Sequence, residues 1–338
     1  MIKKRTIIWI LLILLLFISC EKLFLDKDPN DTPSSVFETF WTNLDQKYSF
    51  FTLKGIDWDS VYNEYKPQVH NDLQPDELWD ILSSMLCVLN DGHVSLSDNE
   101  KWSNWGKCRR RRYTINFDYD LIVNNYLEKP LKYSGPLLYD KIDSVGYIYC
   151  SSFESTVTGA NMDFLVGYFK DTKGLIIDIR SNGGGDSENG DVIESRLLSA
   201  KTLVEYIYYK NGPGHNDFTS PQELYISPEG DGQYVKPIAI LINHDCFSSA
   251  SFFASRMSVL PHVSLIGDTT SGGAGRPRYF DLPNGWIVRY SSNYALRPDG
   301  LNFENGVPPD YRVEMEDSDK VKGIDTIIEY AKSWINSQ

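Results

Sequence analysis

The fold is decided by one stretch, residues 238–253, which reads IAILINHDCFSSASFF. Its first five residues, Ile238 to Ile242, have the length and the apolar composition of a strand that is buried on both faces. A short polar turn follows, and from Ala250 the pattern is helical. A buried strand that runs through a turn into a helix is typical of α/β layered sheets.

A second stretch of this kind is GLIIDIRSNGGGD, residues 174–186. Its apolar run is again of strand length and is followed by three glycines. Further strands are expected at 146–150, 204–209, 263–266 and 286–290, and helices at 161–169, 194–198 and near the C-terminus. Strands that alternate with helices predict an α/β fold.

The chain before this region has a helical pattern. From residue 36 to residue 89, apolar residues recur at spacings of three and four, and Pro75-Asp76-Glu77 fits a helix start. The turn signal Asn90-Asp91-Gly92 ends this pattern. A small N-terminal helical domain is therefore expected, and residues 98–140 are too short to hold an inserted peptide-binding domain.

The first twenty residues predict export. Basic residues at positions 3–5 precede an apolar run that closes at Ser19 and Cys20, as in a secretory signal. The segment resembles a bacterial lipobox, which implies that Cys20 carries a lipid that anchors the protein to a membrane of the cell envelope. An ordinary cleaved signal with an incidental cysteine is the alternative. Residues 21–35 have the composition of a flexible tether.

Charge and cysteine spacing exclude other classes of function. The formal net charge of −13 over 338 residues argues against nucleic acid as a partner. The cysteines after Cys20 show no CxxC spacing, which argues against a zinc site and leaves the pairing of any disulfide open.

The turn after residue 242 could carry a nucleophile. A serine there would expose its hydroxyl at a helix N-terminus, where free N–H groups can stabilise an oxyanion. Ser248, Ser249 and Ser251 could equally be helix caps. The glycines at 183–185 could let a ligand approach the backbone closely or could form a plain turn. A phosphate loop is disfavoured, because the lysine and the following Ser or Thr are missing.

Two further residues are candidates for acid–base chemistry. His93 follows a tight turn at the end of the helical region, although a lone histidine is usually structural or simply exposed. Glu304 lies in NFENGVPPD, residues 302–310, where it could be an exposed loop charge or the group that orients a base.

These segments together resemble the tail-specific (C-terminal-processing) and tricorn clan of serine peptidases. The resemblance implies a crotonase/ClpP-like layered α/β catalytic domain. The implied organisation is a lipoprotein signal peptide at 1–20, a tether at 21–35, a helical domain at 36–97, a connecting segment at 98–140 and the catalytic domain at 141–338.

The resemblance also implies roles for individual residues. In that clan the nucleophile is the serine before Ala-Ser, which is Ser249 here. Ala250 and Gly184 would supply the oxyanion N–H groups, with Gly183 and Gly185 as alternatives to Gly184.

The clan divides over the base. The tail-specific lysine is replaced by Gly273, so the implied base is that of the tricorn branch, His93, held by Glu304. The serine before the tricorn histidine is Gly92 here.

The implied activity is endopeptidase hydrolysis of peptides or unfolded proteins through an acyl-enzyme, without metal or cofactor. Two rival hypotheses are a non-catalytic lipoprotein that binds peptides or apolar ligands, and an esterase or amidase with the same triad.

Overall fold

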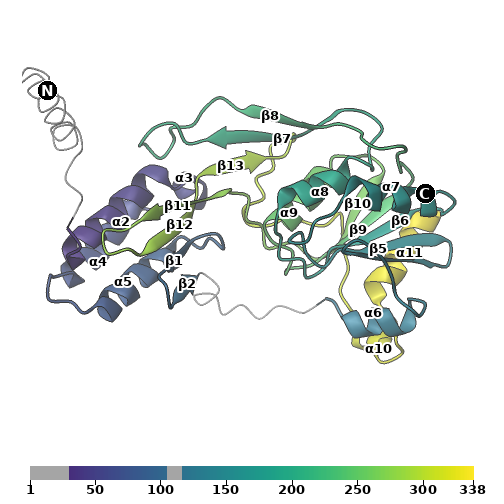
Figure 1. Cartoon of the computed structure of the whole chain (residues 1–338), viewed down its shortest axis with the longest axis horizontal. Coiled ribbons are helices and arrows are strands. Elements are labelled where there is room, and N and C mark those ends of the chain that lie inside the picture. Colours follow the sequence, from purple (N-terminus) through teal and green to yellow (C-terminus); the bar gives the residue numbers. More distant parts are fainter. Residues whose placement is uncertain (1–29, 105–115) are drawn as a thin grey trace, which may run out of the picture.

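The structure, a computed structural model, describes residues 30–104 and 116–338 (Figure 1). Cys20 and the predicted signal peptide lie outside these residues. Three sheets and the helices packed on them make up the described chain.

The central sheet has seven strands in the order β14-β10-β9-β6-β5-β4-β3. Its first five strands are mutually parallel, and β4 and β3 are antiparallel additions at one edge. Strands β6 and β9, which the sequence predicts as buried, lie side by side at its centre and are buried along their whole length. The strands are β3 (Lys132–Ser134), β4 (Leu137–Ile142), β5 (Val145–Tyr149), β6 (Leu175–Asp178), β9 (Ile238–Ile242), β10 (Val263–Gly267) and β14 (Tyr311–Arg312).

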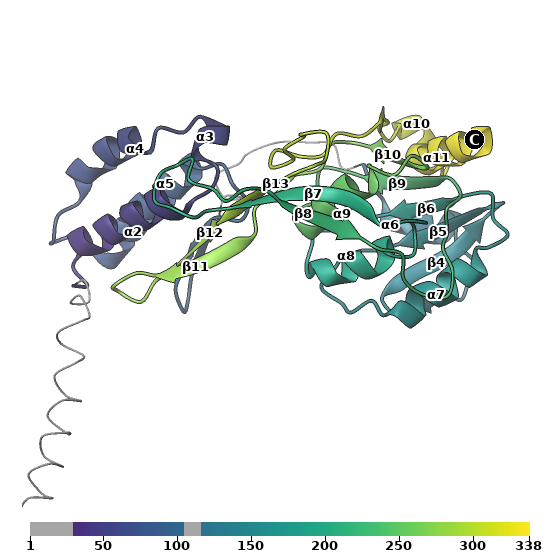
Figure 2. The ribbon, with the colours of Figure 1, turned by 90° about the horizontal axis from the view of Figure 1, so that it is seen from above.

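Helices cover both faces of this sheet. One face carries α7 (Gly159–Tyr168), α8 (Ser187–Glu194) and α9 (Ser249–Met257), whose apolar side chains share a core with alternate residues of the strands. The other face carries α6 (Tyr119–Asn125) and α11 (Thr326–Ser337), with the short α10 (Asp317–Lys320) beside them (Figures 1 and 2). The predicted layered α/β fold is therefore confirmed.

A buried ion cluster fixes the carboxyl end of β6, just before the glycine loop. The guanidinium of Arg180 pairs with Asp178 at 2.6 Å and with Asp325, the N-cap of α11, at 3.0 Å. All three side chains are fully buried. Paired charges of this kind tolerate burial only with several hydrogen bonds, which constrain the loop that follows.

The N-terminal region is helical, as predicted. It contains α2 (Pro33–Lys47), α3 (Phe51–Lys54), α4 (Trp58–Tyr65), the 3₁₀ turn η1 (Lys66–Gln68) and α5 (Pro75–Val88). A capping box between Gln74 and Glu77 starts α5, with proline in its first turn.

These helices pack on a four-stranded antiparallel sheet that joins distant parts of the chain. Its order is β11-β12-β1-β2, and its strands are β1 (Ser95–Ser97), β2 (Trp102–Asn104), β11 (Pro277–Asp281) and β12 (Ile287–Ser291). Residues 277–291, which the sequence analysis assigned to the catalytic domain, thus share a core with the N-terminal helices.

A third sheet lies between the helical region and the central sheet (Figure 2). Its order is β13-β7-β8, with β7 (Thr202–Tyr209), β8 (Gln222–Ile226) and β13 (Asn293–Leu296). Cys87 is disulfide-bonded, whereas Cys150 and Cys246 are free and buried. Within the described ranges, every helix is too short or too polar to cross a bilayer.

Candidate active site

The turn between β9 and α9 places Ser248 at the head of the helix. Asn243, directly after β9, holds the turn: its Oδ1 accepts hydrogen bonds from the backbone N–H of Ser181 at 2.9 Å and of Asp245 at 3.2 Å. Ser248 has φ 55° and ψ −122°. Such a conformation costs a non-glycine residue about 1–3 kcal/mol and concentrates at functional sites.

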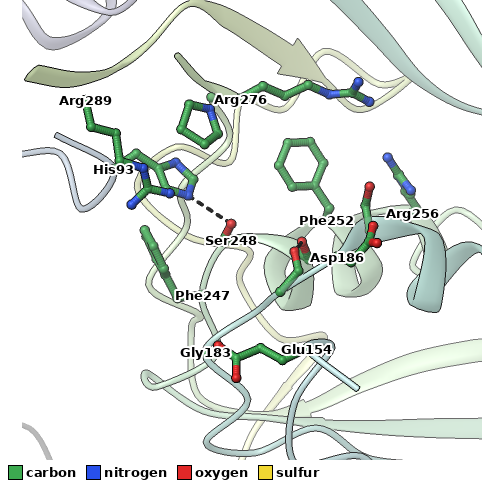
Figure 3. Close-up of a pocket in the computed structure, with 15 residues that line it drawn as sticks. His93, Glu154, Gly183, Asp186, Phe247, Ser248, Phe252, Arg256, Arg276 and Arg289 are labelled. Atoms are coloured by element: carbon green, nitrogen blue, oxygen red, sulfur yellow. Dashed lines mark hydrogen bonds between the residues drawn. The ribbon is translucent and has the colours of Figure 1, made fainter. Parts of the chain in front are cut away.

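His93 contacts Ser248 from the N-terminal part of the chain (Figure 3). Its Nε2 lies 2.9 Å from Ser248 Oγ, and its ring packs on Phe247. The backbone N–H of His93 donates to Asp91 Oδ1 at 2.7 Å, and Asp91 Oδ2 accepts from Ser291 Oγ at 2.8 Å. The Ser248 side chain makes no capping bond to α9, so its hydroxyl can donate to the imidazole.

The expected pairing of His93 with Ser249 is therefore corrected to a pairing with Ser248. Ser249 is the first residue of α9, and its Oγ donates to the carbonyl of Gly185 at 2.6 Å. Ser251 is also structural, because its Oγ lies 2.9 Å from Thr270 Oγ1. The sequence pattern located the polar turn. It did not show that Ser248, the residue just before the helix, lies at the bend, whereas Ser249 is already helical.

Both N–H groups expected to form an oxyanion hole are already engaged. The backbone N–H of Ala250 donates to the carbonyl of Phe247 at 3.1 Å. The N–H of Gly184 donates to Asn182 Oδ1 at 2.9 Å. The prediction that Ala250 and Gly184 are the oxyanion donors is thus corrected, because each N–H group donates within the local turn and not into the pocket.

Other amides at the same place remain available. The N–H groups of Ser249, Gly183 and Gly185 donate to no acceptor in the part of the chain that the structure describes. The loop lies close to the helix: a Cβ on Gly184, whose φ is 98°, would meet the carbonyl oxygen of Phe247 at 2.8 Å. Only glycine allows this approach, which explains why the loop has no side chain there.

Glu304 does not bond to His93 but is held nearby by a lysine. Its Oε1 pairs with Lys54 Nζ at 2.8 Å, and its Oε2 accepts from the backbone N–H of Ala274 at 2.9 Å. Lys54 also donates to two backbone carbonyls just after helix α5. Burial, and next the charge of Asp91, raise the pKa of Glu304 to about 8, although Lys54 opposes them. The sequence analysis missed Lys54, which lies in an otherwise ordinary helical stretch.

Asp91 is a second residue that the sequence analysis missed as a partner of His93. His93 Nδ1 is buried and has no hydrogen-bond partner among the described residues. The backbone carbonyl of Gly275 raises the pKa of His93, because it stabilises the protonated ring. It does not, however, meet the geometry of a hydrogen bond to Nδ1. The charge of Asp91 also favours the imidazolium, so Asp91 performs part of the role expected of Glu304.

The net environment keeps His93 neutral. Burial lowers its pKa to about 4, and the cationic side chains of Arg289 and Lys54 act in the same direction against Asp91 and Gly275. A neutral imidazole can accept a proton from a hydroxyl, which is what a general base requires.

This shift predicts an unusual pH dependence. The base form of His93 should persist down to about pH 4, because a lowered pKa means that protonation occurs only in more acidic solution. We expect kcat/KM of any reaction that uses His93 as its base to stay nearly constant from pH 7 to pH 5.5 and to fall only near pH 4. An acidic limb near pH 6.5, the ordinary histidine value, would contradict the buried position of the ring.

Ser248 and His93 open into a pocket of about 490 Å³. Gly183 and Gly185 contribute to its lining, and so do three arginines, Arg256, Arg276 and Arg289. Within the described ranges, no three His, Cys, Asp or Glu side chains are grouped so as to hold a metal ion. The geometry is that of a serine hydroxyl, a neutral base and unengaged amides at one helix terminus, which can perform acyl transfer.

Comparison with known proteins agrees with this chemistry. The family model described as peptidase family S41 matches residues 144–313, and that of the tricorn protease C1 domain matches residues 29–87. The chain belongs to peptidase family S41. Ser248 and Glu304 lie inside the S41 match, whereas His93 lies between the two matched regions.

Individual relatives of this S41 chain are tail-processing and tricorn proteins. A crystal structure described as "a putative peptidase" from Parabacteroides merdae is 39% identical, has a TM-score of 0.84, and covers 90% of this chain and 97% of its own. The carboxy-terminal processing protease CtpA of Bacillus subtilis is 25% identical over 187 residues, which are 55% of this chain and 38% of CtpA. The tricorn protease of Thermoplasma acidophilum is 28% identical over 162 residues, which are 47% of this chain and 14% of that protein.

The S41 chain spans less than two fifths of the length of these two curated relatives. The resemblance to the tail-specific and tricorn clan is confirmed.

Proposed function

We propose that the protein is a serine peptidase in which Ser248 is the nucleophile and His93 is the general base. The observation that carries this proposal is the 2.9 Å contact between His93 Nε2 and Ser248 Oγ, made by a serine in a strained conformation at the head of α9. Family membership supports the same reaction class.

The reaction follows from these positions. Ser248 Oγ attacks the carbonyl carbon of the scissile peptide as His93 Nε2 takes its proton. The tetrahedral intermediate collapses when His93 returns that proton to the leaving amine and the C–N bond breaks. A water molecule, deprotonated by the same nitrogen, then attacks the ester carbon and releases the acid together with the free hydroxyl of Ser248.

The oxyanion would be held by backbone amides. We assign one donor to the N–H of Ser249, which follows the nucleophile at the start of α9, and the other to Gly183 or Gly185. These amides have no acceptor among the described residues and lie close to Ser248, and the helix dipole adds to their effect. Loss of one such donor typically costs about a hundred- to a thousand-fold in rate.

The proposed substrates are peptides or unfolded proteins, cleaved internally. The named relatives are processing and tricorn proteases, and a pocket open to solvent at the head of a helix suits an extended chain.

A covalent probe tests the function directly. The purified protein should react with a fluorophosphonate, and peptide mass spectrometry should find the adduct on Ser248. An adduct on Ser249 would overturn the assignment of the nucleophile. Absence of any adduct, together with binding of unstructured peptides, would favour the non-catalytic binding lipoprotein.

We further propose that the protein is exported and lipid-anchored at the cell envelope through Cys20. The basic residues, apolar run and cysteine of the first twenty residues support this. In a bacterial host supplied with an alkyne fatty acid, the full chain should become labelled and a Cys20→Ala variant should not. Equal labelling of both would refute the anchor.

A further inference from the structure

An arginine of the catalytic pocket, Arg289, has no counter-charge among the described residues. Arg289 lies on β12, directly opposite Ser95 of β1, two residues after the general base. It lines the same pocket as His93 and Ser248. No carboxylate in residues 30–104 or 116–338 pairs with it, and its Nε is buried without a hydrogen-bond partner.

The neighbouring arginine on α9 is different. The guanidinium of Arg256 is already paired, with Glu205 at 2.8 Å and with Asp191 at 2.7 Å. A half-buried guanidinium without such partners is costly, because part of its hydration is lost and nothing replaces it. The buried Nε itself is out of reach of a ligand, but Arg289 lines the pocket and is partly exposed, and a cation there without a counter-charge favours an anion that arrives with the ligand.

The position of Arg289 indicates which part of the ligand carries the anionic group. Figure 3 shows Arg289 beside His93, on the side of the pocket away from Phe252. Its charge acts on the imidazole, so the two groups are close. Because the histidine hands its proton to the leaving amine, the leaving fragment must pass on the histidine side of the nucleophile.

We propose that Arg289 binds a carboxylate on the leaving fragment of the substrate, a specificity that rests on the catalytic roles proposed above. The carboxylate is either the free C-terminus of a short leaving fragment or an acidic side chain next to the scissile bond. The guanidinium offers a planar fork of N–H donors that matches a carboxylate in two parallel hydrogen bonds.

A second arginine that makes no ion pair with any described residue provides a matched control. Arg276 lines the same pocket but extends over Phe252 toward Arg256, away from His93 (Figure 3). Arg276→Gln and Arg289→Gln therefore remove the same charge from the same pocket, on opposite sides of Ser248.

The experiment uses peptides that are identical before the scissile bond and differ after it. One pair has a short leaving fragment that ends in a free acid or an amide, and the other has Asp or Asn as the first leaving residue within a longer amidated fragment. At pH 7.5, well above the pKa of about 4 of His93, kcat/KM of the wild type should favour the carboxylate member of at least one pair by about 10- to 100-fold. The pair that shows the preference identifies the source of the carboxylate.

The two variants test whether Arg289 causes the preference for a carboxylate. Arg289→Gln should reduce the preference to less than threefold, and Arg276→Gln should keep the wild-type preference; because the preference is a ratio within one variant, a general loss of activity does not affect it. A wild type without preference, or an equal loss in both variants, would overturn the proposal.

Binding to the Ser248→Ala protein separates this proposal from the peptidase assignment. Calorimetric titration should show tighter binding of the acid peptide, abolished by adding Arg289→Gln. If that preference is seen in a protein whose wild type hydrolyses nothing, the carboxylate site stands and the peptidase assignment fails. If binding shows no preference that depends on Arg289, the carboxylate site fails whatever the activity.

Discussion

Ser248→Ala should lose about 10⁴- to 10⁶-fold in kcat, the range typical for removal of a serine nucleophile. Among the residues that the structure describes, only this hydroxyl contacts His93 Nε2, so the variant has no oxygen there to deprotonate. The oxyanion amides and the pocket remain, and residual hydrolysis would come from them alone.

Ser249→Ala is the matched control. It removes the hydrogen bond from Oγ to the Gly185 carbonyl but keeps the backbone N–H that we assign to the oxyanion. We expect a loss of no more than about tenfold, since one hydrogen bond contributes about 0.5–1.5 kcal/mol. Rates on an unstructured peptide, with thermal unfolding of each variant as a check of folding, distinguish the two. An inactive Ser249→Ala beside an active Ser248→Ala would restore the assignment made from sequence.

The layered fold could be predicted because its central strands carry a local signal. Strands β6 and β9 are apolar along nearly their whole length, and both end in polar turns that precede a helix. Burial on both faces requires such runs, so the composition alone indicates the layer. The pairing of β12 with β1 had no such signal, because it depends on how segments some 190 residues apart meet in space.

The choice between the adjacent Ser248 and Ser249, unlike the layered fold, could not be made from the sequence pattern. The sequence pattern located the turn, but the proposed nucleophile is distinguished by its backbone conformation, the φ of 55° at Ser248. This conformation turns Ser248 toward His93 and leaves Ser249 facing the glycine loop. Likewise, the sequence does not show that the amides of Ala250 and Gly184 already donate to local acceptors.

At pH 9.5, where Glu304 is ionised beside Lys54 despite its raised pKa of about 8, Lys54→Met should destabilise the protein by about 2 kcal/mol, because the buried carboxyl group must then take up a proton or stay charged without a counter-charge. Only 6% of the Lys54 side chain and 2% of the Glu304 side chain are exposed. The ion pair also links α3 of the helical region to the loop that carries Ala274, beside the imidazole: a Cβ on Gly273 would lie 3.1 Å from His93 Cε1. We therefore expect kcat to fall together with stability.

The exposed ion pair between Lys66 and Glu38 provides the control, since a third or more of each side chain is open to solvent. Lys66→Met should cost no more than about 1 kcal/mol, as exposed pairs generally do. Urea unfolding followed by tryptophan fluorescence compares the variants. Equal losses in Lys54→Met and Lys66→Met would show that the buried pair contributes nothing special.

A double variant and a pH series identify the unpaired charge as the cause. Adding Glu304→Gln to Lys54→Met should recover at least half of the lost stability, because a neutral amide replaces the isolated carboxylate. The penalty of Lys54→Met alone should also shrink as the pH falls from 9.5 to about 8, the raised pKa of Glu304 with its lysine in place. Removal of the lysine raises that pKa further, so the carboxyl group takes up a proton in the folded state and loses the charge that makes its burial costly. A penalty that is independent of pH would instead assign the loss to the packing of the lysine chain.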